Sequence, residues 1–266
     1  MKHQENKTGS VQKKLSSFLL YFGVVICLSF FTTCADHATK KITVSASSNL
    51  IQAFDHLRVS FQKKTGIQVI YNFASSGKLS QQIEHGAPVD VFASADTAYI
   101  SRLAKEKIID PDSAKPYASG RLAFFSRQAD LIPSKVEELD LTAIERITIA
   151  NPEHSPYGVI ARTVLKNNNL WDRLQHRLIL ADNVRQALTY VETGDVSAAL
   201  LPLSLVINLK KGAYSVIPES QHEPLIQSIG IVNQTLHKKE AQTFVNFVIS
   251  EQGQSILRKY GYQSLK

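Results

Sequence analysis

Residues 73–96 read FASSGKLSQQIEHGAPVDVFASAD, and this stretch decides which class of fold we expect. It begins at the end of a predicted strand, passes through a hydroxyl-rich turn into a short amphipathic helix, and returns through Gly-Ala-Pro to a second strand. Ser75 and Ser76 stand at the expected N-cap, ahead of Leu79 and Ile83, which lie on one helix face. A strand, a helix and another strand in succession indicate a parallel β-α-β unit.

The same kind of junction recurs at three other places in the chain. Hydroxyl or amide side chains also precede predicted helices at Ser48-Asn49, Ser155-Pro156-Tyr157 and Asn183-Val184. The simpler interpretation is that these side chains only cap their helices. Helix starts, however, leave backbone N–H groups unpaired, and in open α/β sheets they meet at one edge. The recurrence therefore predicts a site for a small anion, held by N–H groups and neutral hydroxyls rather than by lysine or arginine.

Composition is ordinary for a globular protein. The chain has 266 residues, of which 44% are hydrophobic and 20% charged, and this length allows two lobes. The formal charge is +7, but no basic run exceeds two residues, so nucleic acid is a poor candidate partner. None of the eight histidines forms the helical i, i+4 pair with a carboxylate that zinc sites use, and we expect no metal centre.

The first 35 residues, 1–35, are expected to be an export signal to the periplasm. A lysine pair at 13–14 precedes an apolar run over 15–31. Cleavage after Ala35 would release a soluble protein, lipidation of Cys34 would anchor it, and an uncleaved anchor helix is a third route. Both cysteines of the chain fall in this segment, so no disulfide is expected beyond it.

Several blocks of the sequence match a known family in order and spacing. They are VSASSNL at 44–50, FASSG at 73–77, QIEHGAPVDVFASAD at 82–96, NPEHSPYG at 151–158, DNVRQAL at 182–188 and KYGY at 259–262. On these blocks, the chain from Lys41 to its end resembles the periplasmic molybdate-binding components of molybdate ABC transporters. Strand and helix signals alternate over the same region, as an α/β fold requires.

The resemblance implies a two-lobed periplasmic-binding-protein type II fold of the α/β class. Each lobe is expected to be a mostly parallel sheet flanked by helices, with the ligand in the cleft between the lobes. Lobe I is predicted to comprise residues 41–120 and 226–266, and lobe II residues 121–225. The implied function is capture of molybdate or tungstate by a monomer that needs no cofactor, is not an enzyme, and delivers the anion to a membrane permease.

The resemblance also implies the residues that contact the anion. The first contact is Ser48 or Asn49, through hydroxyl or amide and backbone N–H. The second is Ser76, through its hydroxyl and backbone. The third and fourth are Tyr157 and Val184, through their backbone N–H groups. Many family members add a tyrosine hydroxyl where this chain has Pro202. Proline has no hydrogen to donate, and Ser204 is the nearby candidate to replace the tyrosine. The choice among molybdate, tungstate and sulfate stays open.

Two other classes of function stay open from the residues alone. One is a type II binding protein for ferric ion, phosphate or a small organic acid. An iron site needs tyrosine, histidine and carboxylate ligands that converge, and no such set is evident at the junctions. The other is a hydrolytic enzyme on the same fold, in which Ser76 would need a general base that the sequence spacing does not supply.

Overall fold

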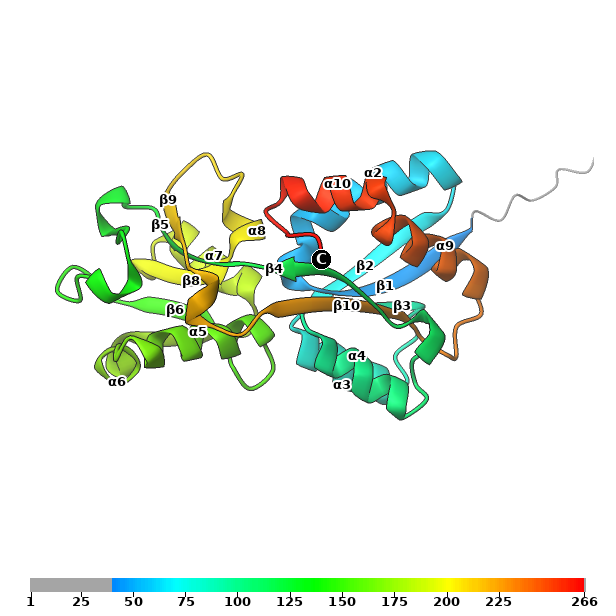
Figure 1. Cartoon of the computed structure of the whole chain (residues 1–266), viewed down its shortest axis with the longest axis horizontal. Helices are drawn as coiled ribbons and strands as arrows, with labels where there is room; N and C mark the ends of the chain where they lie inside the picture. The colour runs from blue at the N-terminus through cyan, green and yellow to red at the C-terminus, as the bar shows by residue number, and fades with distance from the viewer. Residues whose placement is uncertain (1–39, 266) are drawn as a thin grey trace, which may run out of the picture. The chain divides into compact units, whose positions relative to one another are not determined.

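The computed structural model describes residues 40–265. The predicted export signal at 1–35, including Cys34, lies outside the described residues. The strands form two five-stranded sheets flanked by helices (Figure 1), which confirms the predicted two-lobed α/β fold. In the part of the chain that the structure describes, no helix has both the length and the apolar character needed to cross a bilayer.

The first sheet combines parallel strands with one strand that runs against them. Its members are β1 Lys41–Ser47, β2 Gln68–Ala74, β3 Val91–Ser94, β4 Lys115–Gly120 and β10 Leu225–Ile231. They lie in the order β2-β1-β3-β10-β4. β1 pairs in parallel with β2 and β3, whereas β10 is antiparallel to both β3 and β4. A register shift between Gln227 and Ser228 marks a bulge in β10.

Helices cover both faces of the first sheet (Figure 1). One face carries α2 Ile51–Thr65, α9 Lys238–Ile249 and α10 Glu251–Lys259, and the other carries α3 Ser76–Glu84 and α4 Thr97–Lys105. The single-turn helices of this part are η1 Ser48–Leu50 and η2 Pro111–Ser113. Val91 and Ala93 belong to the core under α2, while Phe92 belongs to the core under α3. This alternation is what a strand with two buried faces requires.

The second sheet has the order β7-β6-β8-β5-β9. Its strands are β5 Leu122–Ser126, β6 Ile147–Ala150, β7 Leu178–Ala181, β8 Ala198–Pro202 and β9 Ala213–Val216. Its α-helices are α5 Pro156–Asn167, α6 Trp171–Leu174, α7 Val184–Thr193 and α8 Leu203–Val206. The short turns are η3 Ala129–Leu131, η4 Val136–Glu138, η5 Gln175–Arg177 and η6 Glu219–Gln221. Phe124, Leu188 and Leu201 lie in the core that this sheet shares with its helices.

Both sheets are mixed rather than purely parallel: β10 runs against the other four strands of the first sheet, and β5 against the other four of the second. Each sheet contains two parallel and two antiparallel pairings. The antiparallel pairings involve the strands at the two chain crossings, from β4 into β5 and from β9 into β10. β5 and β10 enter their sheets directly from the other sheet, without the crossover helix that parallel neighbours need.

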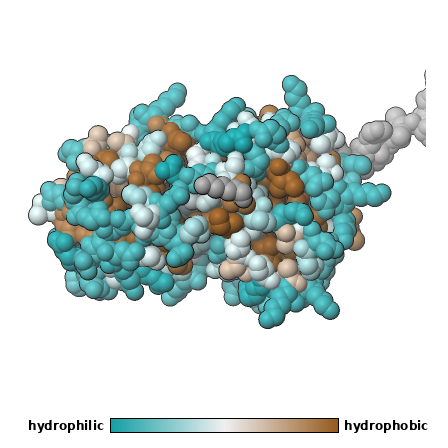
Figure 2. All heavy atoms as spheres, viewed as in Figure 1, coloured by the Kyte–Doolittle hydropathy of each residue, from teal (hydrophilic) through white to brown (hydrophobic). Residues whose placement is uncertain are grey.

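The surface carries few large apolar side chains. On the face seen in Figure 2, hydrophobic residues lie scattered among hydrophilic ones. Among residues 40–265, the most exposed large apolar side chains are Leu236, at 95%, and Val59, at 61%. They lie on different elements, before α9 and on α2. Single apolar residues on a surface are normal and need no partner.

Phe54 on α2 offers a test of the core of the first lobe. Its buried ring packs against Tyr71, Tyr117 and Phe244, with ring centroids 5.7, 6.5 and 6.1 Å away. We expect Phe54→Ala to lower the free energy of unfolding by about 3–5 kcal/mol, because it leaves a cavity. Urea denaturation followed by circular dichroism measures this change. Val59→Ala on the same helix is the exposed control, and an equally small effect of both variants would contradict the core assignment.

Candidate functional site

The residues predicted to bind an anion lie at four places where a strand runs into a helix. β1 leads into η1 at Ser48 and Asn49, and β2 leads into α3 at Ser76. β6 and β7 precede α5 and α7, whose first turns contain Tyr157 and Val184. All five residues are at most 3% exposed. The structure thus places each of them near the carboxyl end of a strand, where open α/β sheets bind ligands.

The first turns of α5 and α7 contain buried N–H groups that have no partner. The Ser155 Oγ accepts a hydrogen bond from the Gly158 N–H at 3.4 Å, and the Asn183 Oδ1 accepts from the two residues after Val184, at 2.9 and 3.1 Å. These caps leave out the N–H groups of Tyr157 and Val184, which have no acceptor among residues 40–265. Since buried N–H groups are seldom left unpaired, these two are available to an acceptor from outside the chain.

Serine hydroxyls add further donors at the other two junctions. The Ser76 Oγ accepts a hydrogen bond from the Ala95 N–H at 3.0 Å, which leaves the hydroxyl proton of Ser76 free to donate. The Ser75 Oγ is buried and has no partner among the described residues. Ser48 is 3% exposed as a residue, and its hydroxyl takes part in no hydrogen bond found within residues 40–265. The four junctions together are therefore rich in donors that carry no formal charge.

Contacts between the elements bring these four junctions together. The Gly77 N–H, one residue after Ser76, donates to the His154 carbonyl at 2.9 Å, just ahead of the α5 cap. The Lys78 ammonium pairs with the carboxylate of Asp182, just ahead of the α7 cap. η1 in turn contacts α7. All four helix starts are thus linked by contacts between residues of the two predicted lobes.

A buried hydrogen-bond network, which no pattern in the sequence predicted, links Asn49 to Tyr157. The Asn49 Nδ2 donates to the Gln227 Oε1 at 3.1 Å and to the Tyr262 hydroxyl at 2.8 Å. The Gln227 Nε2 donates to the Tyr157 hydroxyl at 3.2 Å, and the Tyr117 hydroxyl donates to the Gln227 Oε1 at 3.0 Å. The one signal in the sequence is a glutamine inside the apolar strand β10, at the bulge. We call these five residues the Gln227 network.

The Gln227 network limits which hydrogen-bond donors remain unpaired at the first junction. Both hydrogens of the Asn49 amide are used within the protein, so Ser48 and the backbone are the donors left there. Burial raises the pKa of the Tyr117, Tyr157 and Tyr262 hydroxyls above their usual range. These hydroxyls therefore stay neutral at physiological pH and act as hydrogen-bonding groups rather than as charges.

Ser204 does not replace the tyrosine hydroxyl that Pro202 lacks. The Ser204 Oγ donates to the Asn49 carbonyl at 2.8 Å, so its proton is already engaged. Gly120, at the end of β4, lies against the same network. A Cβ at this position would collide with the Tyr157 hydroxyl and would lie 2.6 Å from the Gln227 Nε2. A larger residue at position 120 would therefore force the Tyr157 and Gln227 side chains of the network to shift.

The charged groups beside the site neutralise one another. The hydrogen bond from Lys78 lowers the pKa of the Asp182 carboxyl, which stays ionised at neutral pH. Burial lowers the pKa of His154, and the nearby Lys78 charge acts in the same direction, so the imidazole is neutral at pH 7. Over residues 40–265, no three His, Cys, Asp or Glu side chains are grouped closely enough to hold a metal ion.

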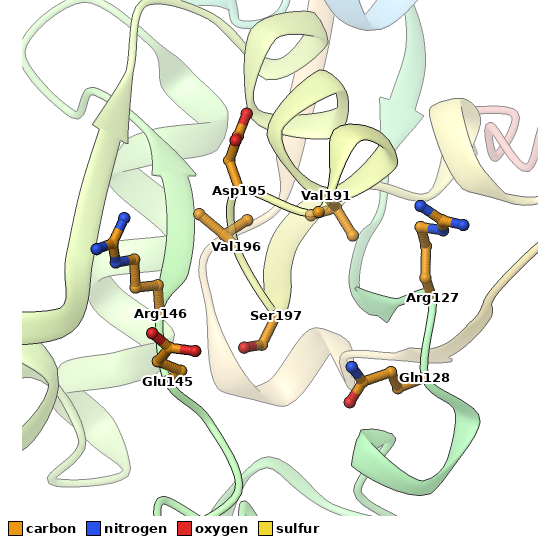
Figure 3. A pocket seen from close by; sticks show the side chains of 9 residues that line it. Arg127, Gln128, Glu145, Arg146, Val191, Asp195, Val196 and Ser197 are labelled. Atoms are coloured by element: carbon orange, nitrogen blue, oxygen red, sulfur yellow. The ribbon is translucent and has the colours of Figure 1, made fainter.

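A surface pocket of about 570 Å³ opens elsewhere on the second lobe (Figure 3). Arg127 follows β5, Arg146 precedes β6 and Ser197 precedes β8, so the pocket lies at the starts of β6 and β8. The junction that leads into α5 lies at the opposite end of β6, so this pocket is separate from it. Glu145 and Asp195 also line the pocket, which therefore has no net preference for an anion.

Tyr262 offers a test of the Gln227 network. We expect Tyr262→Phe to lower the free energy of unfolding by about 1–3 kcal/mol, because the buried amide of Asn49 loses an acceptor. Urea denaturation of the ligand-free protein measures the change. Tyr214→Phe, which changes a partly exposed tyrosine of β9, is the control. It should lower the free energy of unfolding by at most about 0.5 kcal/mol. If Tyr262→Phe unfolded like the unmodified protein, the network would not stabilise the fold.

Comparison with known proteins points to one family. The family model described as bacterial extracellular solute-binding protein matches residues 42–263. The molybdate-binding protein ModA of Escherichia coli (strain K12) is 30% identical over 229 residues, which cover 84% of this chain and 88% of the relative. The putative ABC transporter substrate-binding lipoprotein YvgL of Bacillus subtilis (strain 168) is 28% identical over 253 residues, 93% of this chain and 95% of that protein.

A solved structure agrees with the sequence comparison. The periplasmic molybdate-binding protein of Azotobacter vinelandii superposes with a TM-score of 0.80 at 28% identity, over 85% of this chain and 100% of that one. The resemblance predicted from the sequence blocks is confirmed. The chain belongs to the family of bacterial extracellular solute-binding proteins and is similar within it to the molybdate-binding proteins ModA.

Proposed function

We propose that the protein binds molybdate or tungstate outside the cytoplasm and delivers the anion to the membrane permease of an ABC importer. The observation that carries this proposal is the pair of buried N–H groups on Tyr157 and Val184, which have no acceptor within residues 40–265. The free proton of the Ser76 hydroxyl adds a third donor. The relatives support the choice of anion, since those from Escherichia coli and Azotobacter vinelandii are named as molybdate-binding proteins.

The chemistry of the donors fits a tetrahedral dianion. Molybdate and tungstate offer only acceptor oxygens at neutral pH, so a site made of donors satisfies them. The helix starts of α3, α5 and α7 add favourable dipoles, each of about 0.3–1 kcal/mol. Hydrogen phosphate carries a proton and is therefore a poorer match for a site in which donors predominate. Sulfate is a smaller tetrahedron, so donors positioned for the larger anions would fit it less well.

Each predicted residue has a distinct part in the proposed site. Ser48 donates through its hydroxyl and Asn49 through its backbone, since the Asn49 amide belongs to the Gln227 network. Ser76 donates through hydroxyl and backbone, with its oxygen fixed by the Ala95 N–H. Tyr157 and Val184 donate only through the backbone. Such donors keep their direction, so the site selects by size and protonation state.

We propose that capture depends on closure of two lobes, residues 41–120 with 226–266 and residues 121–225. β4 and β5 are joined by Arg121 alone, and β9 and β10 by residues 217–224. Short connections of this kind absorb the dihedral changes of a hinge motion. Closure would bring the starts of α5 and α7 to those of η1 and α3, and would bury the anion among them.

We propose that residues 1–35 direct export and that Cys34 is the residue that would carry a lipid anchor. The support is the lipoprotein name of the Bacillus subtilis relative YvgL. We further propose that the protein acts as a monomer, without a cofactor and without catalytic activity. The Ser76 hydroxyl pairs with the Ala95 N–H rather than with a general base, so nothing there activates it as a nucleophile.

Isothermal titration of the purified protein tests the proposed ligand. Molybdate, tungstate, sulfate and phosphate are titrated at one pH. We expect one-to-one binding of molybdate or tungstate, with sulfate at least about a hundredfold weaker, a difference of roughly 2.7 kcal/mol. Phosphate is expected to bind weakly as well, because of its proton. If neither molybdate nor tungstate gave a heat of binding, the proposed function would be overturned. If sulfate alone bound tightly, sulfate would replace molybdate as the proposed ligand.

Ser48→Ala tests one proposed contact without disturbing the fold. The Ser48 hydroxyl makes no hydrogen bond within residues 40–265, so its loss should leave the melting temperature of the ligand-free protein unchanged. We expect the affinity for molybdate to fall about tenfold, roughly 1.4 kcal/mol, as for a hydrogen bond to a charged group. Ser101→Ala, exposed on α4, is the control. Unchanged affinity in Ser48→Ala would remove Ser48 from the site.

A further inference from the structure

Two adjacent residues of α3 reach two different loops of the second lobe. The Gly77 N–H donates to the His154 carbonyl at 2.9 Å. The Lys78 ammonium pairs with the Asp182 carboxylate, and the side chains of this pair are 43% and 41% exposed. Gly77 follows the proposed donor Ser76 directly and Lys78 lies two residues after it, while His154 and Asp182 directly precede the caps Ser155 and Asn183. The contacts therefore form at the rim of the proposed site, and only when the two lobes meet there.

Gly77 allows the second lobe to approach this closely. A Cβ on Gly77 would lie 2.8 Å from the His154 Cβ, 2.9 Å from the His154 Cα and 2.7 Å from the Tyr99 hydroxyl. Gly77 does not have the left-handed backbone conformation that would itself require glycine. In the first turn of a helix, alanine would be the better residue. The glycine is thus unfavourable for α3 alone, and its benefit is the room that it leaves for His154.

We propose that Gly77, Lys78, His154 and Asp182 form a closure latch, which holds the two lobes together over the bound anion and so determines how long the anion is retained. The latch rests on the proposed function, because it acts on the closed, anion-bound form. A contact that exists only in the closed form shifts the equilibrium toward that form. It raises the affinity for the anion without touching the anion.

The latch and a direct electrostatic role make opposite predictions for Asp182. If Asp182 acted only through its negative charge near the anion, Asp182→Asn would remove a repulsion and strengthen binding. The latch predicts the reverse. Asp182→Asn removes the partner of Lys78, so the lobes open more readily and the anion leaves faster. The sign of the change therefore separates the two roles.

The Gly77→Ala variant tests the close approach. We expect its affinity for molybdate to fall by at least about tenfold, because the added methyl group meets the His154 backbone in the closed form. The melting temperature of the ligand-free variant should be unchanged or higher, since alanine favours the helix. Adding Tyr99→Phe removes the crowding within the first lobe and should not restore binding. Wild-type affinity in Gly77→Ala, or full recovery with Tyr99→Phe, would overturn the latch.

Variants of Lys78 and Asp182 test the ion pair by calorimetry and stopped-flow dissociation of molybdate. We expect Lys78→Met and Asp182→Asn each to weaken binding about two- to fivefold, through a faster off-rate. The charge-reversed double variant Lys78→Asp/Asp182→Lys should recover most of the loss. Arg58→Met is the control. It breaks the Arg58–Asp55 ion pair, which is similarly exposed but lies within α2 and does not join the lobes.

The outcomes separate the latch from the proposed function. If the unmodified protein binds molybdate and Asp182→Asn binds it as tightly or more tightly, the latch is wrong and the proposed function stands. If the charge-reversed variant shows the sum of the two single losses, the latch is wrong as well. If the unmodified protein does not bind molybdate, the proposed function fails and the latch fails with it.

Discussion

The backbone N–H groups at the start of a helix cannot be satisfied by the helix itself, and the site depends on this constraint. Ser155 and Asn183 cap their helices but leave the N–H groups of Tyr157 and Val184 buried and unpaired. An unpaired buried donor costs about 1–3 kcal/mol. A closed form without an acceptor at these positions is therefore unfavourable. Under the proposed function, closing of the lobes and binding of the anion would be one event, because the anion would supply the acceptor that these two N–H groups lack in the closed form.

The Gln227 network gives this arrangement a rigid base made of neutral groups. Gln227 connects the amide of Asn49 with the hydroxyls of Tyr117 and Tyr157, and Tyr262 joins from the end of the chain. Burial keeps these hydroxyls protonated. Neutral groups suit a contact that forms and breaks as lobes move, because no full charge has to be desolvated each time. The same contact fixes Tyr157, whose backbone N–H is one of the proposed donors.

The sequence predicted local features well and features that depend on distant segments poorly. The sequence predicted that Ser76, Tyr157 and Val184 stand at helix starts, because capping residues and apolar periodicity are local signals. The direction of β10 was missed, since antiparallel pairing depends on which strand the returning chain meets. Gln227 was missed for a related reason. Its partners lie far away in the sequence, and a polar residue in an apolar strand shows that a partner is needed without showing which one.

No lysine or arginine is among the contacts of the proposed site, and the positions of the charged residues account for this. Lys78 lies two residues after Ser76, yet its ammonium group is engaged by Asp182. A free lysine there would attract anions of any size, because a flexible charge imposes little geometry. Pairing it across the lobes removes that unspecific attraction and converts the charge into a contact of the closed form. Discrimination among oxyanions is then left to N–H and hydroxyl donors, whose positions are fixed by the strands and helices that carry them.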